Sequence, residues 1–487
     1  MSQIYQVPMS WIGGILELSS PLRYGITTRG IPIYRFVPYD RTLGPFAVGC
    51  SHRDLLRNVH AIVARDSGST EPECASKKEI PRATLVQLLG VPTAETETNI
   101  LLTAYAYDSK KELRKHLTLE PTNPRQSPRQ RIDGFTFHID PPGCRDVDDT
   151  FTFFRSSETT WTISINIADV SAYVEEGSAL DLFIQQKATS FYSPTGEVLA
   201  PMLPPHIEQV ASLLPGEDKL TLSLQFDWQG EEISEIKAVR WIPSITNTTA
   251  SYTYDEACLH GPSPREEFQI LAKLSKSEDS HKWVETLMIF YNTKAGELLK
   301  ERGEGILRSH STPQMDKLNA WTAIDPDLAF LAYEAASYVH AKEESFHYGL
   351  GASSYAYASS PIRRYCDLVN QRAIHSIHRI HKLSPHIDAM YSSLIEHLNR
   401  RQKQAKAFSR DLFLMTQLKG DSSAVTGTVV EIKEDSFKVY VPVWKRVVRV
   451  KTIQKVPTIK TQVSLRWHDD MKKAFWKERI VFAFEPL

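Results

Sequence analysis

One acidic loop constrains this chain more than any other feature of its sequence. Residues 138–151 read HIDPPGCRDVDDTF and hold Asp140, Asp146, Asp148 and Asp149 within ten positions. Carboxylates this close together repel one another unless a cation or hydrogen bonds offset their charge. Any fold of the chain must supply that compensation, and Mg²⁺ or Mn²⁺, which prefer carboxylate and water oxygens, are the usual means.

The spacing of the four aspartates suits one or two metal ions. Two ions roughly 3.5–4 Å apart would serve phosphodiester hydrolysis, one by activating water and the other by stabilising the leaving oxygen. A second interpretation stays open on spacing alone, because aspartates are also common turn and N-cap residues. An EF-hand calcium loop does not fit, because the positions that need glycine and glutamate hold Arg145 and Phe151.

Composition narrows the class of protein. The 487 residues are 41% hydrophobic and 24% charged, which is typical of two to four globular domains. The net charge is −1, so nucleic-acid binding would need a local basic surface. Five scattered cysteines without a CxxC motif favour an intracellular, reducing compartment, with cytoplasm, nucleus and organelle matrix left open. The sequence shows neither a signal peptide nor a long apolar run, so no membrane association is expected.

The N-terminal part, residues 1–128, is predicted to be rich in β-structure. GIPIYRFVPYD (30–40) and NILLTAYAYD (99–108) are interpreted as strands, while ATLVQLLGV (83–91) fits a strand or a short helix. Residues 119–131, with three prolines and three arginines, are typical of a linker and predict the first domain boundary.

The remaining chain divides into two parts. Residues 129–419 begin with strand-like runs and become helical from about Glu266, ending in a long basic helix over about 391–419. The basic stretch 397–410 is interpreted as a solvated helix face, with RNA-backbone contact as the alternative. Residues 420–487 return to short alternating strands, which favours a small barrel such as an OB fold.

A second segment, SSPIRRYCDLVNQR (359–372), has the features of a helix N-terminus. Ser360 is a suitable cap and Pro361 suits the first turn. Arg363 would then lie where backbone N–H groups and a guanidinium can hold a phosphate together. An ordinary helix pair between Arg363 and Asp367 is an equally good interpretation of this segment taken alone.

Taken together, IDPPGCRDVDDTF and SPIRRYCDLVNQR resemble the two signature segments of the RNB superfamily, the RNase II-type exoribonucleases. The PPGC stretch is most similar in style to the eukaryotic exosome exoribonuclease subunit and its relatives. Further resemblances follow in the family's order: NIADVSAYVEEGSALD, ATSFYSPTGEVLAPMLPP, SLLPGEDKLTLSL, SYTYDEA, VETLMIFYNTKA, ILRSHSTP and HYGLGASSYAYASSPIRRY.

The resemblance implies an α+β or α/β catalytic RNB domain flanked by β-barrel, OB-type domains. Residues 1–128 would form a cold-shock or OB-like RNA-binding domain. The catalytic domain would span residues 129–419, and residues 420–487 would form a C-terminal OB-type RNA-binding domain.

The resemblance also implies roles for particular residues. Asp140, Asp146, Asp148 and Asp149 match the family's magnesium-site aspartates, and Asp149 would be catalytic as well. Arg363 matches the arginine that grips the scissile phosphate and would be both catalytic and RNA-binding. The remaining RNA-binding residues would be two tyrosines, Tyr192, which matches a clamp on the 3′-terminal nucleotides, and Tyr254, near the RNA path.

The implied activity is that of a hydrolytic 3′→5′ exoribonuclease. It would depend on Mg²⁺, with Mn²⁺ as an alternative, and would degrade single-stranded RNA to nucleoside 5′-monophosphates. Other RNA-decay or RNA-processing proteins are conceivable partners. Association with the exosome is not expected, because the endonuclease domain and the three-cysteine motif of its catalytic subunit are missing from this sequence. The alternative function is a catalytically silent RNA-binding regulator on the RNB fold.

Three positions depart from the family's pattern. Asn166 stands where many relatives carry histidine, Gln371 where histidine usually precedes the arginine, and FYS (191–193) where YLP is typical. None of them replaces a predicted metal ligand, and the four aspartates are all present. The sequence therefore favours the active enzyme over the silent regulator.

Overall fold

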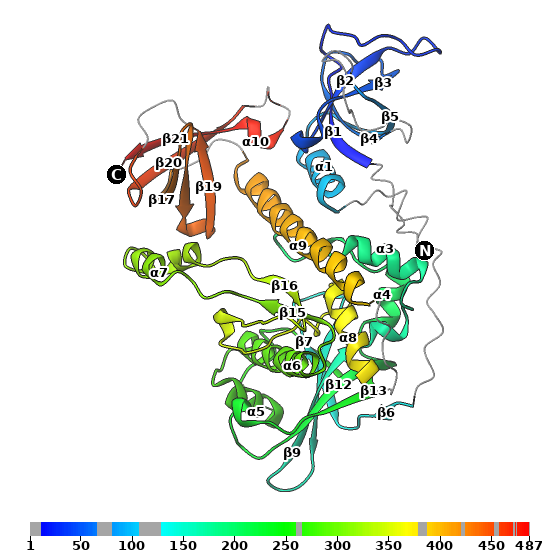
Figure 1. Ribbon diagram of the computed structural model, residues 1–487, viewed down its shortest axis with the longest axis vertical. Coiled ribbons are helices and arrows are strands. Elements are labelled where there is room, and N and C mark those ends of the chain that lie inside the picture. The colour runs from blue at the N-terminus through cyan, green and yellow to red at the C-terminus, as the bar shows by residue number, and fades with distance from the viewer. Residues whose placement is uncertain are drawn as a thin grey trace.

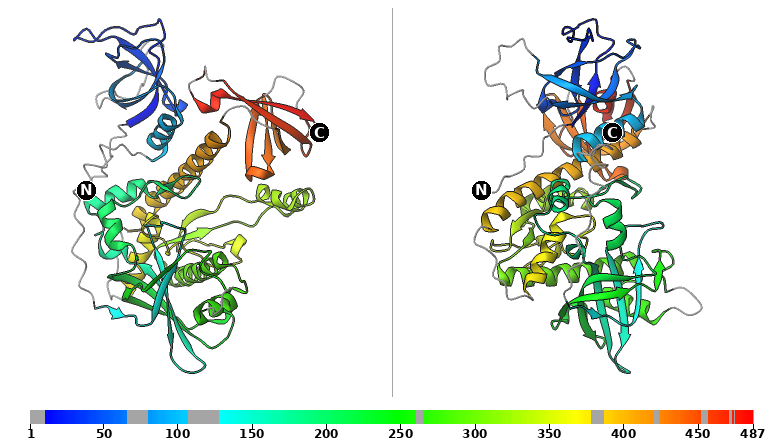
Figure 2. Two further views of the ribbon diagram at one scale, coloured as in Figure 1. Left: turned by 180° about the vertical axis from the view of Figure 1, so that it is seen from behind. Right: turned by 90° about the vertical axis from the view of Figure 1, so that its right-hand side faces the viewer.

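The computed structural model describes residues 11–65, 80–106, 128–259, 265–377, 387–419, 424–451, 457–470, 473 and 475–486. An N-terminal β-barrel and a C-terminal five-stranded sheet lie at one end of the molecule, beside a larger α+β body (Figure 1). Helix α9 (Ile387–Gln417) extends from this body toward both small β units, as the views in Figure 2 show. The predicted arrangement, an α+β domain flanked by small β domains, is confirmed.

The N-terminal unit is a closed barrel with the strand order β1-β2-β3-β5-β4. Its core consists of side chains such as Leu16, Phe36, Phe46 and Val63. The stretch 83–91, left open between strand and helix, is the strand β5. The bounds are β1 Trp11–Leu16, β2 Ile33–Pro38, β3 Phe46–Gly49, β4 Val59–Arg65 and β5 Arg82–Gly90.

The prediction of a strand over residues 99–108 was wrong. The described part of this stretch lies in helix α1 (Ala94–Ala106), which packs on β1 and α9. Ile100 and Leu101 are buried together with Glu97, a spacing that places all three on one side of a helix. Gly13 allows this packing, because a Cβ there would lie 3.2 Å from the Ile100 carbonyl oxygen. Tertiary contact therefore decided against the strand-like composition.

A seven-stranded sheet forms the centre of the larger α+β body, in the order β14-β7-β8-β9-β12-β13-β6. Its pairings are antiparallel except for β13 with β6 and β14 with β7. One face carries Phe137, Phe151, Ile165 and Leu224 into the main core. The bounds are β6 Gln130–Arg131, β7 Phe135–Ile139, β8 Asp149–Arg155, β9 Trp161–Ala168, β12 Asp218–Trp228, β13 Arg240–Asn247 and β14 Ala250–Tyr252.

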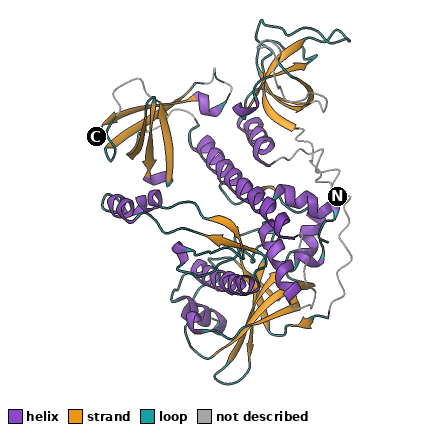
Figure 3. Cartoon of the chain, viewed as in Figure 1, coloured by secondary structure: helices purple, strands orange, loops and turns teal. Residues whose placement is uncertain are grey.

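Helices cover this sheet and connect it to the small β units (Figure 3). The predicted long basic helix is confirmed as α9, which begins a few residues earlier than expected. The other helices are α3 Ala179–Lys187, α4 Pro205–Ala211, α5 Glu266–Ser275, α6 Ser280–Arg302, α7 Met315–Thr322, α8 Tyr365–Ile377 and α10 Trp476–Arg479. Short strands are β10 Phe191–Tyr192, β11 Val198–Ala200, β15 Ile306–Ser309 and β16 Ser337–His340.

The C-terminal unit is an antiparallel sheet in the order β19-β18-β17-β20-β21. Its core side chains, among them Val439 and Val463, pack against Leu412 and Met415 near the end of α9. The bounds are β17 Val425–Lys433, β18 Ser436–Val441, β19 Arg446–Lys451, β20 Gln462–Asp469 and β21 Ile480–Pro486.

Most of the predicted linker, residues 119–131, lies outside the described residues. The second predicted boundary, at residues 419 and 420, falls where the described chain is interrupted. The two boundaries between the three predicted domains therefore stay a prediction. Among the residues that the structure describes, no helix combines the length and the apolar character needed to cross a bilayer.

One arginine of the basic stretch 397–410 serves neither of the two predicted purposes. Arg401 is buried, and its guanidinium donates to the carbonyl oxygens of Lys187, at 3.0 and 3.1 Å, and of Tyr105, at 2.6 Å. It therefore ties α9 to the end of α3 and to α1. Lys187 and Tyr105 are 82 positions apart in the sequence, so this role depends on tertiary structure.

Asp411 joins the three parts of the molecule. Its carboxylate is almost fully buried and accepts hydrogen bonds from Tyr39, after β2, at 3.2 Å and from Tyr105 in α1 at 2.8 Å. Lys477 of α10 donates to it at 2.6 Å, and Arg410 forms an ion pair with it. A second ion-pair group lies nearby, where Arg479 contacts Glu97 and Asp469. The N-terminal barrel, α9 and the C-terminal unit therefore meet at buried carboxylates.

Asp411→Leu is expected to loosen this junction. Two partly buried tyrosine hydroxyls lose their acceptor, at a cost of about 1–3 kcal/mol, while Arg410 and Lys477 can turn to water. Hydrogen–deuterium exchange should become faster in α1 and in residues 475–479. Glu396→Leu, an exposed position on the same helix, is the control, and equal exchange in the two variants would contradict the role of Asp411.

Candidate active site

The acidic loop connects β7 to β8 and is fixed by backbone contacts on both sides. Asp140 follows β7 and its N–H donates to the Tyr252 carbonyl at 3.0 Å, whereas Asp149 is the first residue of β8. Between them, Ser212 accepts from the Val147 N–H at 3.0 Å and donates to the Arg145 carbonyl at 2.7 Å. The loop is therefore held in one conformation by the sheet and by the residue that follows α4.

Asp148 is the buried partner of Arg363. One carboxylate oxygen accepts from the Ile362 N–H at 2.8 Å and the other from Arg363 Nε at 3.1 Å. The carbonyl of Arg363 in turn accepts from the Ser190 N–H at 3.0 Å. The structure thus brings together the two sequence segments that predicted the site, which lie 215 positions apart in the chain.

Asp140 and Asp149 form the open part of the site. Asp140 Oδ2 contacts His138 Nδ1 at 2.8 Å. The carboxylate of Asp149 makes no hydrogen bond within the described part of the chain. Burial and the neighbouring charge of Asp140 raise the pKa of Asp149 to about 7, against the smaller opposing effect of Arg363. Asp149 is therefore an uncompensated carboxylate beside another carboxylate.

Burial of a carboxylate is costly at Asp148 as well. Burial raises the pKa of Asp148 well above its usual value, and the guanidinium of Arg363 and the Ile362 N–H only partly offset this. A divalent cation is the usual remedy for such a group of carboxylates. The chemistry of Asp140 and Asp149, two hard oxygen donors with no competing partner on Asp149, fits Mg²⁺ or Mn²⁺.

No group of three or more His, Cys, Asp or Glu side chains in the described ranges is arranged around a single ion. Asp146 and Asp148 are instead turned to other partners, Tyr192 and Arg363. The predicted site with four aspartate ligands therefore stays a prediction, and the structure supports Asp140 and Asp149 as its most open pair.

Tyr192 contacts an aspartate. Its hydroxyl donates to Asp146 Oδ2 at 2.7 Å, and burial together with Asp146 raises the pKa of this hydroxyl. Tyr192 lies on β10, where the pairing with β11 is irregular between Phe191 and Tyr192. Its predicted contact with the 3′-terminal nucleotides stays a prediction, and the structure adds a hydrogen bond to the acidic loop.

Tyr254 lies on the other side of the site, after β14. Burial and the charges of Asp140 and Asp149 raise the pKa of its hydroxyl to about 12, which places this tyrosine near the two open carboxylates. Its ring stacks on His281 with 3.8 Å between ring centroids and 8° between ring planes. One face of Tyr254 is thus covered by the first turn of α6.

Two details of the segment 359–372 differ from the prediction. Helix α8 begins at Tyr365, because Pro361–Arg363 form a turn instead of the first helical residues. The alternative pair between Arg363 and Asp367 was wrong, because Asp367 contacts Arg364 at 2.7 Å and accepts from the Ser360 N–H at 2.8 Å. That turn directs Arg363 toward Asp148 and away from its own helix.

The positions that depart from the family pattern have structural partners. Asn166 donates to Thr150 and Thr152, at 3.2 and 2.8 Å, and accepts from Ser223 at 2.7 Å. Gln371 donates to the Ala168 carbonyl at 2.8 Å and accepts from the Ser171 N–H at 3.1 Å. Both amides satisfy buried groups behind the acidic loop and do not reach the aspartates.

Sequence reasoning missed His138 as a member of the site. Strand alternation was the available signal, because Phe137 and Ile139 are core residues and His138 must point to the opposite face. Its contact with Asp140, two residues ahead, follows from that placement. The main-chain N–H of Ile362 was also missed, and no sequence signal marks it.

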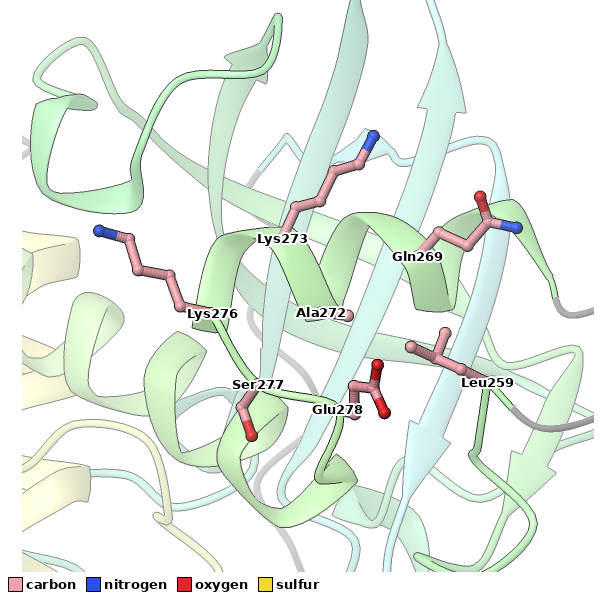
Figure 4. A pocket seen from close by; sticks show the side chains of 7 residues that line it. All are labelled: Leu259, Gln269, Ala272, Lys273, Lys276, Ser277 and Glu278. Atoms are coloured by element: carbon pink, nitrogen blue, oxygen red, sulfur yellow. The ribbon is translucent and has the colours of Figure 1, made fainter.

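The described cavities lie elsewhere. A shallow one of about 460 Å³ borders α5, where Lys273 and Lys276 extend away from Glu278 (Figure 4). A larger one of about 770 Å³ lies between the end of α9, α10 and strands β19 and β21. No predicted site residue lines either cavity, so the acidic loop remains the candidate active site.

The site joins one acidic loop to one arginine-bearing turn on a mixed sheet, and a closed β-barrel and a five-stranded sheet complete the described molecule. The family model described as "RNB domain" matches residues 129–261 and 326–380, so the predicted resemblance to the RNB superfamily is confirmed. The exosome complex exonuclease RRP44 homolog A of Arabidopsis thaliana is 23% identical over 89% of this chain and 55% of its own length. This chain thus spans about half of that relative.

Solved structures show the same fold. Mycoplasma genitalium RNase R in complex with ribose-methylated single-stranded RNA superimposes with a TM-score of 0.68 at 14% identity, over 97% of this chain and 100% of that one. Yeast Ssd1, described as a pseudonuclease, gives a TM-score of 0.68 at 17% identity, over 95% of this chain and 68% of that one. The fold is therefore common to proteins described as nucleases and as pseudonucleases.

Two neighbouring aspartates are expected to respond oppositely to substitution in metal-free protein. Asp149→Asn removes an uncompensated carboxylate and should raise Tm by about 3–6 °C at pH 8 in EDTA. Because the folded pKa of Asp149 is raised to about 7, this gain should be absent near pH 4 and grow as pH rises to 8. Asp148→Ala leaves the buried Ile362 N–H without an acceptor and should lower Tm.

Differential scanning calorimetry of both variants and the wild type measures this contrast. Asp133→Asn, at an exposed position before β7, is the control for the loss of one negative charge. A lower Tm for Asp149→Asn at pH 8 would show that Asp149 is compensated.

Proposed function

We propose that the protein is a 3′→5′ exoribonuclease that hydrolyses single-stranded RNA with Mg²⁺, or Mn²⁺, and releases nucleoside 5′-monophosphates. The observation that carries this proposal is the position of Arg363, held by Asp148 next to the open pair Asp140 and Asp149. A cation for the phosphate and carboxylates for a metal are what phosphodiester hydrolysis requires. Polarity and product come from the family resemblance.

Arg363 is suited to bind the scissile phosphate. Nε contacts Asp148, and Nη2 donates to Ser360 Oγ at 3.1 Å, which fixes the plane of the guanidinium. Within the described residues Nη1 makes no hydrogen bond, and the side chain is 46% exposed. The guanidinium can thus donate to a phosphate oxygen and stabilise the negative charge that grows there during attack.

Asp140 and Asp149 would hold the metal ion, and Asp146 and Asp148 complete the predicted set. When bound, the ion supplies an activated water and polarises the phosphate. Asp149, with no hydrogen bond of its own among the described residues, is the carboxylate best placed to orient that water. Tyr192 holds Asp146 in place, and Arg363 holds Asp148 in place.

The aromatic residues suit a substrate without defined sequence. Tyr254 offers its ring face away from His281 to a base, and Tyr192 would hold the terminal nucleotide from β10. Base stacking on aromatic rings is tolerant of sequence, and the two small β units would admit single strands.

Cys50, Cys144 and Cys366 are thiols and not disulfides, which supports an intracellular, reducing compartment.

A silent RNA-binding protein on the same fold is the second candidate. The similarity to Ssd1, which is described as a pseudonuclease, is the observation in its favour. The presence of the four aspartates and of Arg363 favours the enzyme, because a protein that only binds RNA has no need of buried, mutually repelling carboxylates. An activity assay separates the two functions.

RNA with a 5′ label is expected to shorten from its 3′ end in the presence of Mg²⁺. Asp149→Asn and EDTA should each reduce the rate by at least about 10³-fold, because both remove a catalytic requirement. Denaturing gels and chromatography of the products measure the ladder and the nucleoside 5′-monophosphates. Intact RNA that still shifts on a native gel would establish the silent regulator instead.

Arg363→Lys tests the phosphate contact separately. Lysine keeps the charge but loses the contact of Nε with Asp148 and the fixed guanidinium plane. We expect kcat to fall about 10²–10³-fold with KM for RNA changed less than threefold. The control is Lys282→Arg, on the exposed first turn of α6. Lys187→Arg would not serve as a control, because Lys187 is buried. An equal fall in both variants would contradict the role of Arg363.

A further inference from the structure

His138 lies inside the sheet, directly behind the acidic loop. It is the fourth residue of β7, pairs in parallel register with Ser251 of β14, and is only 4% exposed. Its neighbours in sequence, Phe137 and Ile139, point into the main core. The imidazole therefore occupies the opposite face of the strand, on the side of Thr136.

The imidazole makes one hydrogen bond, to the carboxylate that begins the loop. Nδ1 lies 2.8 Å from Asp140 Oδ2, and because a carboxylate only accepts, the proton must be on Nδ1. Nε2 is buried and has no partner among the described residues. A buried nitrogen without a hydrogen-bond partner costs free energy. The hydrogen-bonding needs of the histidine itself therefore do not explain why the ring lies here.

The contact fixes the orientation of Asp140. The main chain of Asp140 is already held by its N–H bond to the Tyr252 carbonyl, which leaves the side-chain torsions to be set. Engaging Oδ2 from behind restricts the carboxylate plane and leaves Oδ1 for the space beside Asp149. Asp146 and Asp148 are held by partners of their own, Tyr192 and Arg363, so His138 is the corresponding partner of Asp140.

We propose that His138 is a positioning residue for Asp140, which orients its carboxylate so that Asp140 and Asp149 bind a divalent cation together. This role rests on the metal site of the proposed function. His138 does not contact RNA or the reacting atoms. Hydrogen bonds to the carboxylate ligands of a metal typically change metal affinity by 10–100-fold, and this is the effect expected of the histidine.

A matched pair of variants isolates the hydrogen bond. His138→Asn places an amide nitrogen where Nδ1 lies and keeps the donor, while His138→Leu has nearly the same shape without a donor. Thr136→Val is the control, because Thr136 is buried on the same face and hydrogen-bonds Thr152 at 2.8 Å without touching an aspartate. The full chain is stripped of metal, and Mn²⁺ binding is titrated by electron paramagnetic resonance.

The dissociation constant for Mn²⁺ should rise about 10–100-fold in His138→Leu. It should stay within about threefold of the wild type in His138→Asn and Thr136→Val. Binding of labelled single-stranded RNA in EDTA should be unchanged in all three variants. If His138→Leu does not fold, as judged by circular dichroism, His138→Ala, which removes the donor without adding bulk, replaces it.

Two results would overturn the proposal. Equal Mn²⁺ affinity in the wild type and the donor-free variant would show that Asp140 needs no orienting partner. Equal weakening in His138→Asn and His138→Leu would show that ring shape matters and the hydrogen bond does not. In either case the proposed function stands if the wild type binds Mn²⁺ and degrades RNA. A wild type that binds no Mn²⁺ would rule out both the role of His138 and the proposed function.

Discussion

The repulsion between carboxylates in the loop from Asp140 to Asp149 is the constraint on which the site depends. Each of three aspartates is compensated by a different part of the chain: His138 in β7, Tyr192 in β10, and the turn with Ile362 and Arg363 before α8. Asp149 is the exception, because its carboxylate makes no hydrogen bond within the described residues, and burial raises the pKa of both Asp148 and Asp149. Under the proposed function, this lost stability is what keeps the group ready for a cation, and active sites commonly carry such a cost.

Buried carboxylates also hold the larger structure together. Asp169 accepts from Ser171 at 2.6 Å and contacts Arg129 at 2.6 Å and His375 at 2.9 Å. Burial alone would raise its pKa, but His375, Arg129 and the hydrogen bonds outweigh burial and lower it. Asp411 joins the N-terminal barrel to the C-terminal unit in the same way. Paired aspartates thus fix chain segments around the acidic loop and between the β units.

The fold alone does not decide whether the protein degrades RNA. The same architecture occurs in RNase R and in Ssd1, so activity must depend on the side chains around the acidic loop. Asn166 and Gln371, which depart from the family pattern, form hydrogen bonds behind the site and do not reach the aspartates. Arg363, by contrast, has one donor nitrogen with no hydrogen bond in the described structure, which leaves that nitrogen open to a phosphate oxygen.

The sequence by itself determined the acidic loop, the arginine segment, the long helix α9 and the β-rich ends, because these depend on local composition, periodicity and motif. Only the tertiary structure decided which partner each charged group has. It paired Arg363 with Asp148 and not Asp367, buried Arg401 between α3 and α1, made residues 99–106 helical and placed His138 behind Asp140. The reason is physical: spacing limits what neighbours in sequence can do, whereas the partner of a buried charge is set by packing between segments that the sequence does not relate.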